Sequence, residues 1–500
     1  MVKRIGTAAI GTLLMSAATA FAGGFIYVND ITGRVPTSIA GTVYGNPKPI
    51  FWDTRCLPTF RFNVNPDPIP NPFGASLLTS AQAKAVFQRS LDVWNNVPTS
   101  YIQGTLGADM NTTGPRAFNQ INEVTFNSAA AFQGLAGTVV VRLVEDQSFT
   151  DGQMLDGDAD ADVSGAITTC ADVDNDGDVE FPAGNYSAGT IIDYDIIFNV
   201  KASNGFRWTD DSNPENLRPL LNGRTFDLQA EMVRQLGIVY GLAPSALPEV
   251  NPLTNADEPS TYGNLDVDDA VAQLQRRTLE TEDMAAISTL YPEGTAATGP
   301  AALQAGDVAF DSVYGRIEGS VIQGALNLPA LGANITAIDA AGGKSGPFYA
   351  GNQVSSTYAG TARVAVNPTN LAPQALPVAE GAVNGNFSLT VPHGSYHLNV
   401  EPTDGFPATA TAVNTLTNLG NVYVLNLFEE EFWNGNKESA LEDDPGASTK
   451  VDISPSHLVQ TGVNFITNKM VRVTNAGGPE LSGLDEASPG HCYAVRFPIT

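Results

Sequence analysis

The residues best suited to chemistry are carboxylates that lie between Arg142 and Lys201, a stretch without lysine or arginine. Residues 172–180 read DVDNDGDVE, with carboxylates on alternate residues and Gly177 at the sixth position. Calcium takes oxygen ligands in this alternating pattern, and its loops need a glycine there for a sharp turn. The sequence therefore predicts a calcium site with these ligands: Asp172, Asp174, Asp176, Asp178 and Glu180.

A second acidic turn precedes this loop and has looser spacing. Its carboxylates, also predicted as calcium ligands, are Asp156, Asp158, Asp160 and Asp162. This turn lacks a glycine at the sixth position, and the first loop has Ala183 where a helix–loop–helix calcium site carries a bidentate glutamate. The pattern leaves one alternative open, which is a solvated acidic surface loop.

The charge balance and the cysteines limit the classes of partner and of fold. The 500 residues include 53 acidic and 25 basic side chains, so the net charge of −28 repels phosphate backbones and nucleic acid is not expected as a partner. Three cysteines are too few for a disulfide scaffold. We predict a Cys56–Cys170 disulfide, because both residues precede the expected domain boundary and Cys492 lies near the other end.

Residues 1–22 have the pattern of a secretory signal peptide. Lys3 and Arg4 precede an apolar stretch, and Ala20 and Ala22 form a small-residue cleavage signal. The apolar stretch is shorter than the roughly 20 residues that span a bilayer, and no later run is better suited. We expect cleavage near Ala22, no membrane span, and a protein that is secreted, periplasmic or on the cell surface.

The elements that would position such residues differ between the two halves of the chain. In the first half, apolar residues from Ala83 to Trp94 recur at helical spacing after Thr79, which can cap a helix. Asp227 can cap a second helix that is apolar on every face, which predicts a buried helix. Residues 189–199 are rich in β-branched side chains and predict a strand. This mixture predicts an α+β domain.

The second half is predicted to be all-β. Residues 294–308 have the small, Gly/Pro-bearing composition of a linker. Residues 309–425 alternate apolar and polar side chains between turn signals and predict a β-sandwich. Residues 426–470 are predicted as an acidic loop with a β extension. Residues 471–500 are predicted as a strand region, with the start of a further domain left open.

The second predicted helix resembles a known zinc motif. Residues 234–245, RQLGIVYGLAPS, resemble the zinc-binding helix and turn of the matrixins, HExGHxxGLxHS, in both glycines, the leucine and the serine. The segments at 61–65, 87–100, 193–199 and 279–292 resemble other parts of matrixin-like bacterial secreted proteins in the same order. The resemblance implies a multidomain protein whose first domain, over residues 23–293, is zincin-like.

The resemblance also implies that zinc chemistry is lost. The family's three histidines fall on Arg234, Ile238 and Pro244, and its catalytic glutamate falls on Gln235. A guanidinium repels a metal ion, isoleucine has no donor atom, and glutamine cannot accept a proton at neutral pH. All four histidines follow residue 392, so none lies near the motif. We therefore expect no zinc and assign no catalytic residue.

A second resemblance falls in the β-rich half. Residues 315–321, 328–339 and 385–400 resemble the carboxypeptidase regulatory-like domain, which is a Greek-key sandwich. The two resemblances imply a secreted pseudo-metallopeptidase that binds or scaffolds an extracellular protein or peptide and is stabilised by calcium. Two alternatives stay open: an active secreted metallopeptidase with atypical zinc ligands, and a purely structural surface protein. The sequence does not predict the oligomeric state.

Overall fold

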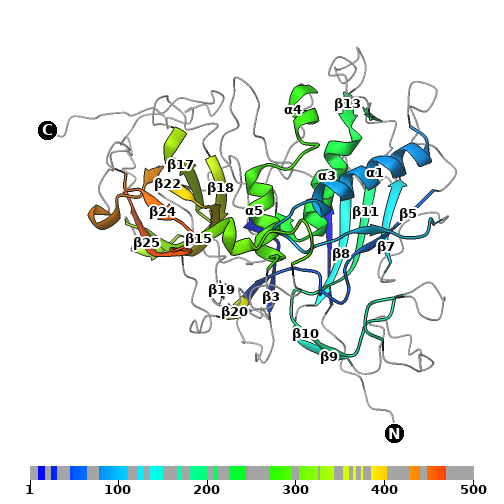
Figure 1. Ribbon diagram of the computed structural model, residues 1–500, viewed down its shortest axis with the longest axis horizontal. Helices are drawn as coiled ribbons and strands as arrows, with labels where there is room; N and C mark the ends of the chain where they lie inside the picture. Colours follow the sequence, from blue (N-terminus) through cyan, green and yellow to red (C-terminus); the bar gives the residue numbers. More distant parts are fainter. Residues whose placement is uncertain are drawn as a thin grey trace, which may run out of the picture.

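The described chain is a mixed α/β structure with many strands and few helices (Figure 1), and this much of the expected fold class is confirmed. None of its helices combines the length and apolar composition needed to cross a membrane. The computed structural model describes residues 10–16, 24–30, 46–64, 78–110, 121–127, 136–143, 145–149, 167–171, 179–199, 206–210, 224–243, 245, 270–294, 303–324, 327–330, 332–342, 353–359, 364–366, 373–375, 385–402, 428, 430–439 and 448–468.

A six-stranded sheet forms the centre of the first half, in the order β1-β8-β11-β7-β5-β6. Its strands are β1 (Ile10–Ser16), β5 (Thr59–Phe62), β6 (Thr105–Leu106), β7 (Asn122–Asn127), β8 (Ala136–Leu143) and β11 (Ile191–Asn199). The strand predicted over residues 189–199 is β11. Strands β5, β6, β7 and β11 pair in parallel, whereas β8 runs antiparallel to both of its neighbours, β11 and β1.

Both predicted helices are confirmed, and they share one core with the sheet. Thr79 caps α1 (Ser80–Asn95) through a capping box with Gln82, and Asp227 caps α3 (Leu228–Val239). The indole of Trp94 on α1 donates to the Val233 carbonyl of α3 at 2.9 Å. Figure 1 shows α1 and α3 side by side against the sheet. Because this core includes the whole length of α3, every residue of that helix is buried.

Short strand pairs and a disulfide surround the sheet. The pairs are β2 (Gly24–Phe25) with β14 (Leu242–Ala243), β3 (Tyr27–Asp30) with β4 (Asn46–Pro49), β9 (Gln147–Phe149) with β10 (Gly184–Tyr186), and β12 (Phe206–Thr209) with β13 (Arg224–Asp227). A disulfide joins Cys56 to Cys170, with Cα atoms 4.8 Å apart. It lies in a small apolar cluster with Val141, Phe149 and Tyr186.

Two sheets that share an apolar core make up the second half. The first contains β15 (Tyr314–Gln323), β16 (Leu328–Pro329), β21 (Asn386–Pro392) and β25 (Val459–Thr467). The second contains β17 (Asn334–Asp339), β18 (Gln353–Tyr358), β22 (Gly394–Glu401), β23 (Glu431–Phe432) and β24 (Val451–Ile453), and β19 (Val364–Val366) pairs separately with β20 (Pro373–Ala375). Single turns of 3-10 helix lie at η2 (Phe310–Ser312), η3 (Ala340–Gly342) and η4 (Gly435–Lys437). Strands β23 to β25 therefore extend these sheets beyond residue 425.

Helix α5 (Thr281–Leu290), which follows the short α4 (Ala270–Gln275), connects the two halves. The buried carboxylate of Glu282 accepts hydrogen bonds from the Ser245 hydroxyl in the first half and the Ser356 hydroxyl on β18. The Thr289 hydroxyl donates to Thr390 on β21 at 2.8 Å. The α5 side chains therefore pack against both halves.

Candidate functional site

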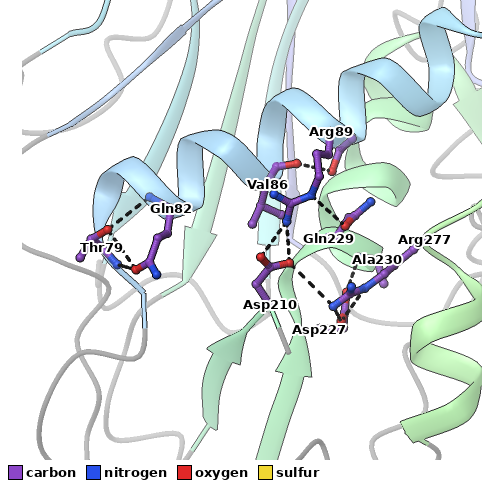
Figure 2. Close-up of polar contacts among 10 residues, drawn as sticks. Thr79, Gln82, Val86, Arg89, Asp210, Asp227, Gln229, Ala230 and Arg277 are labelled. Atoms are coloured by element: carbon purple, nitrogen blue, oxygen red, sulfur yellow. Dashed lines mark hydrogen bonds and ion pairs between the residues drawn. The ribbon is translucent and has the colours of Figure 1, made fainter. Parts of the chain in front are cut away.

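Helix α3 carries the motif positions, and a chain of ion pairs fixes its N-terminal end (Figure 2). The Asp227 carboxylate accepts from the Ala230 amide at 2.7 Å and from Arg277 Nε at 2.9 and 3.0 Å. Arg277 also lies 3.8 Å from the Asp210 carboxylate, whose two oxygens each accept from Arg89 Nη2 on α1 at 2.7 Å. These contacts attach the start of α3 to α1 and to the segment after β12.

The C-terminal end of α3 is fixed by a glycine turn and two aromatic side chains. Gly241 has a φ of +92°, and a Cβ there would lie 2.4 Å from the Ile50 carbonyl oxygen. Only glycine fits this left-handed position without strain. The Trp52 indole donates to the Val239 carbonyl at 2.9 Å, and the Tyr291 hydroxyl donates to the Tyr240 carbonyl at 2.8 Å. Contacts with other elements therefore hold both ends of α3 in place.

Two of the motif positions share one carboxylate. Arg234 donates to Glu231 through Nη2 at 2.8 Å and through Nε at 3.1 Å, and Gln235 donates to the same carboxylate at 2.7 Å. Ile238 is 9% exposed and belongs to the apolar core, and Pro244 lies outside the described residues. Among the described residues, no three His, Cys, Asp or Glu side chains form a group that could hold a metal ion.

A second arginine approaches this pair. Burial, together with the nearby Arg234, lowers the pKa of Arg276 to about 9, although Glu231 and Asp283 oppose the shift. We refer to Glu231, Arg234, Gln235, Arg276 and Asp283 as the α3 charge cluster. Its positive and negative charges compensate each other. The sequence contained one signal for it, a Glu–Arg pair three residues apart on an otherwise apolar helix.

Strand β8 presents a different arrangement of charge. Arg142 is 3% exposed, and neither its Nε nor its Nη1 has a hydrogen-bond partner. It lies opposite Ile191 of β11 on one side and Gly11 of β1 on the other. Burial lowers the pKa of its guanidinium. The available signal was a single arginine in the apolar run TVVVRL, and sequence reasoning assigned it no role.

The acidic loops are described only at their base. The candidate ligands Asp172 to Asp178 and Asp156 to Asp162 lie outside the described residues. Glu180 is buried, and its backbone exchanges hydrogen bonds with Ala171 at 2.9 and 3.3 Å. Cys170, next to Ala171, is held by the disulfide to Cys56. Ala171 and Glu180, which flank the segment 172–179, therefore lie side by side, and calcium binding stays a prediction.

The described contacts thus define a compensated charge cluster on α3 and an uncompensated arginine on β8. No protein-family model matches the chain, and no curated protein matches it. The matrixin-like and carboxypeptidase regulatory-like resemblances therefore stay predictions, and function is inferred from the contacts themselves.

Proposed function

We propose that the chain is an exported, non-catalytic polypeptide-binding protein with a zincin-like first domain, and that it holds an extended segment along β8. One observation carries this proposal: β1 pairs antiparallel with β8 over seven residues, from Ile10 opposite Leu143 to Ser16 opposite Gly137. An edge strand offers unpaired N–H and C=O groups to any extended chain of suitable register. Strand β1 is an example of such an occupant.

The predicted processing of the chain makes this position available to other segments. Strand β1 lies within residues 1–22, which have the pattern of a signal peptide. Cleavage near Ala22 would remove β1 and leave β8 as the edge of the sheet. Because β8 is buried along its whole length with β1 in place, the freed edge would expose apolar and backbone polar groups that a bound polypeptide covers.

The α3 charge cluster supports the non-catalytic part of the proposal. Arg234 stands where the resemblance implies a zinc ligand, and a guanidinium repels a cation. The amide of Gln235, at the position of the general base, donates to Glu231 and cannot take up a proton at neutral pH. The mixed sheet, the two covering helices and the Gly241 turn support a zincin-like fold, and the two packed sheets support a sandwich in the second half.

Calcium completes the proposal as a stabilising ion, not as a catalyst. The pairing of Ala171 with the buried Glu180 on either side of the segment 172–179 supports a calcium loop with carboxylates on alternate residues. The short connection to the Cys56–Cys170 disulfide would transmit this stabilisation to the sheet. Such an ion raises the free energy of unfolding according to its concentration and affinity.

The test uses the exported protein and a peptide of residues 8–18, which contains β1. Intact mass first establishes whether residues 1–22 are absent. Fluorescence anisotropy then measures binding of the labelled peptide, and we expect saturable binding. The same peptide with Leu13→Pro is the control, because proline lacks the amide and disrupts strand pairing. A processed protein that binds neither peptide contradicts the proposal, and chelator-sensitive cleavage of the peptide supports the metallopeptidase alternative.

A further inference from the structure

We infer that the β8 edge selects an apolar extended segment that carries one carboxylate side chain, aspartate or glutamate, opposite Arg142. This inference rests on the proposed function. Its starting observation is the state of Arg142, a 3% exposed guanidinium whose Nε and Nη1 meet no acceptor. By contrast, Arg234 and Arg277 each form an ion pair with a carboxylate.

An arginine in this condition favours an anionic partner. With the edge occupied, as it is by β1, burial of a charged group without hydrogen bonds is unfavourable, and the guanidinium cannot escape this penalty by losing its proton near neutral pH. A carboxylate that arrives with a ligand supplies both the counter-charge and two acceptor oxygens in the fork geometry that arginine matches. Binding of such a ligand therefore gains energy that the free protein lacks.

The register of β1 identifies the position of the acid. Arg142 lies directly opposite Gly11, and directly opposed residues of antiparallel strands project to the same face with Cβ atoms roughly 4.5–5.5 Å apart. Glycine has no side chain, so the β1 residue opposite Arg142 offers no side-chain acceptor. On the other side, the residue opposite Arg142 is the apolar Ile191. A carboxylate must therefore come from the occupant, at the position that Gly11 takes in β1.

The net charge of the protein limits the number of acidic residues that we expect in the bound segment. A net charge of −28 repels a strongly acidic partner at long range, and this repulsion is screened beyond about 8–10 Å. One carboxylate at the Arg142 position gains the local interaction while adding little repulsion. The sequence of β1, IGTLLMS, is mainly apolar, so an apolar strand is the kind of occupant that we infer.

The experiment compares four peptides of residues 8–18 on the exported protein: the natural sequence and the Gly11→Gln, Gly11→Glu and Gly11→Lys forms. Gln matches Glu in size, so the ratio of their dissociation constants isolates the charge. We expect the Glu peptide to bind about tenfold more tightly than the Gln peptide, as charge-assisted hydrogen bonds do, and the Lys peptide to bind most weakly. The same series on Arg142→Met protein should lose the Glu–Gln difference while Gln-peptide binding persists.

The outcomes separate the inference from the proposed function. Equal binding of the Gln and Glu peptides overturns the inference and leaves the edge as a polypeptide site. Failure of all four peptides to bind the processed protein contradicts the proposed function, and the inference with it. If Arg142→Met does not fold, as shown by circular dichroism, the Gln, Glu and Lys peptides on the unaltered protein still decide the question.

Discussion

Helix α3 and strand β8 each bury an arginine, but only the helix supplies its own counter-ion. Arg234 has Glu231 one turn away in the same helix, at 2.8 Å, and Gln235 shares that carboxylate. Arg142 has no carboxylate at its Nε or Nη1. Burial of a charged side chain therefore does not by itself indicate a functional position, since Arg234 and Arg142 are both buried. A charge compensated within the fold contributes to structure, whereas an uncompensated one leaves energy for a ligand to recover.

The largest effect should follow from breaking the compensated pair. In Glu231→Ala, Arg234 keeps its charge and its burial but loses both hydrogen bonds, so we expect the free energy of unfolding to fall by about 3–5 kcal/mol. Urea unfolding at pH 7, followed by tryptophan fluorescence, measures this loss. The matched control is the double variant Glu231→Leu/Arg234→Met, which removes both charges and should recover most of the stability. If the single variant loses less than about 1 kcal/mol of unfolding free energy, Glu231 does not compensate Arg234. The contrast between Arg234 on α3 and Arg142 on β8 would then be lost.

A pH titration extends the comparison to a buried acid. Burial raises the pKa of Glu282 to about 7, although the hydroxyls of Ser245 and Ser356 oppose the shift and Asp283 adds to it. The folded state therefore holds this proton at pH values where the unfolded state, with a pKa near 4.3, has released it. The free energy of unfolding should fall as the pH rises from about 4.5 to about 7, by at most roughly 4 kcal/mol, and stay level above that range.

Glu282→Gln is the control for this titration. Glutamine does not titrate, and its Oε1 can accept from one serine hydroxyl while its Nε2 donates to the oxygen of the other. The difference in unfolding free energy between the wild type and the variant, measured by urea unfolding at several pH values, should therefore change between pH 4.5 and 7 and be constant on either side. A difference that is independent of pH would show that the pKa of Glu282 is the same in the folded and unfolded states.

Local features were predictable from the sequence, and long-range ones were not. The helices α1 and α3 and their caps depend on residues within a few positions of Thr79 and Asp227, so the pattern was sufficient. The partners of a strand depend on segments far apart in the chain, so nothing local indicated that residues 10–16 could pair with β8. The same holds for Arg276 and Glu282, whose neighbours come from other elements.

Calcium removal tests whether the acidic segment also depends on an external partner. If Asp172 to Glu180 bind calcium, an ion concentration 100 times the dissociation constant raises the free energy of unfolding by about 2.7 kcal/mol, and a chelator should remove that gain. Thermal unfolding in calcium and in EDTA measures it. Asp174→Asn should abolish the calcium effect, whereas Asp158→Asn, in the looser turn, should change it less. An unfolding temperature that does not respond to calcium contradicts the site.

The smallest effect, and the one of opposite sign to Glu231→Ala, is expected from Arg142→Met. Methionine keeps an unbranched apolar stem and removes a charge that has no internal partner, so the desolvation cost disappears without breaking an ion pair. We expect the free energy of unfolding of the unprocessed protein, in which β1 pairs with β8 and Arg142 is buried, to stay the same or to rise by about 1 kcal/mol, measured by the same urea unfolding. A loss above about 2 kcal/mol would mean that Arg142 is compensated within the fold, as Arg234 is. The strand and the helix would then bury their arginines for the same structural reason, and the acid preference of the β8 edge would lose its physical basis.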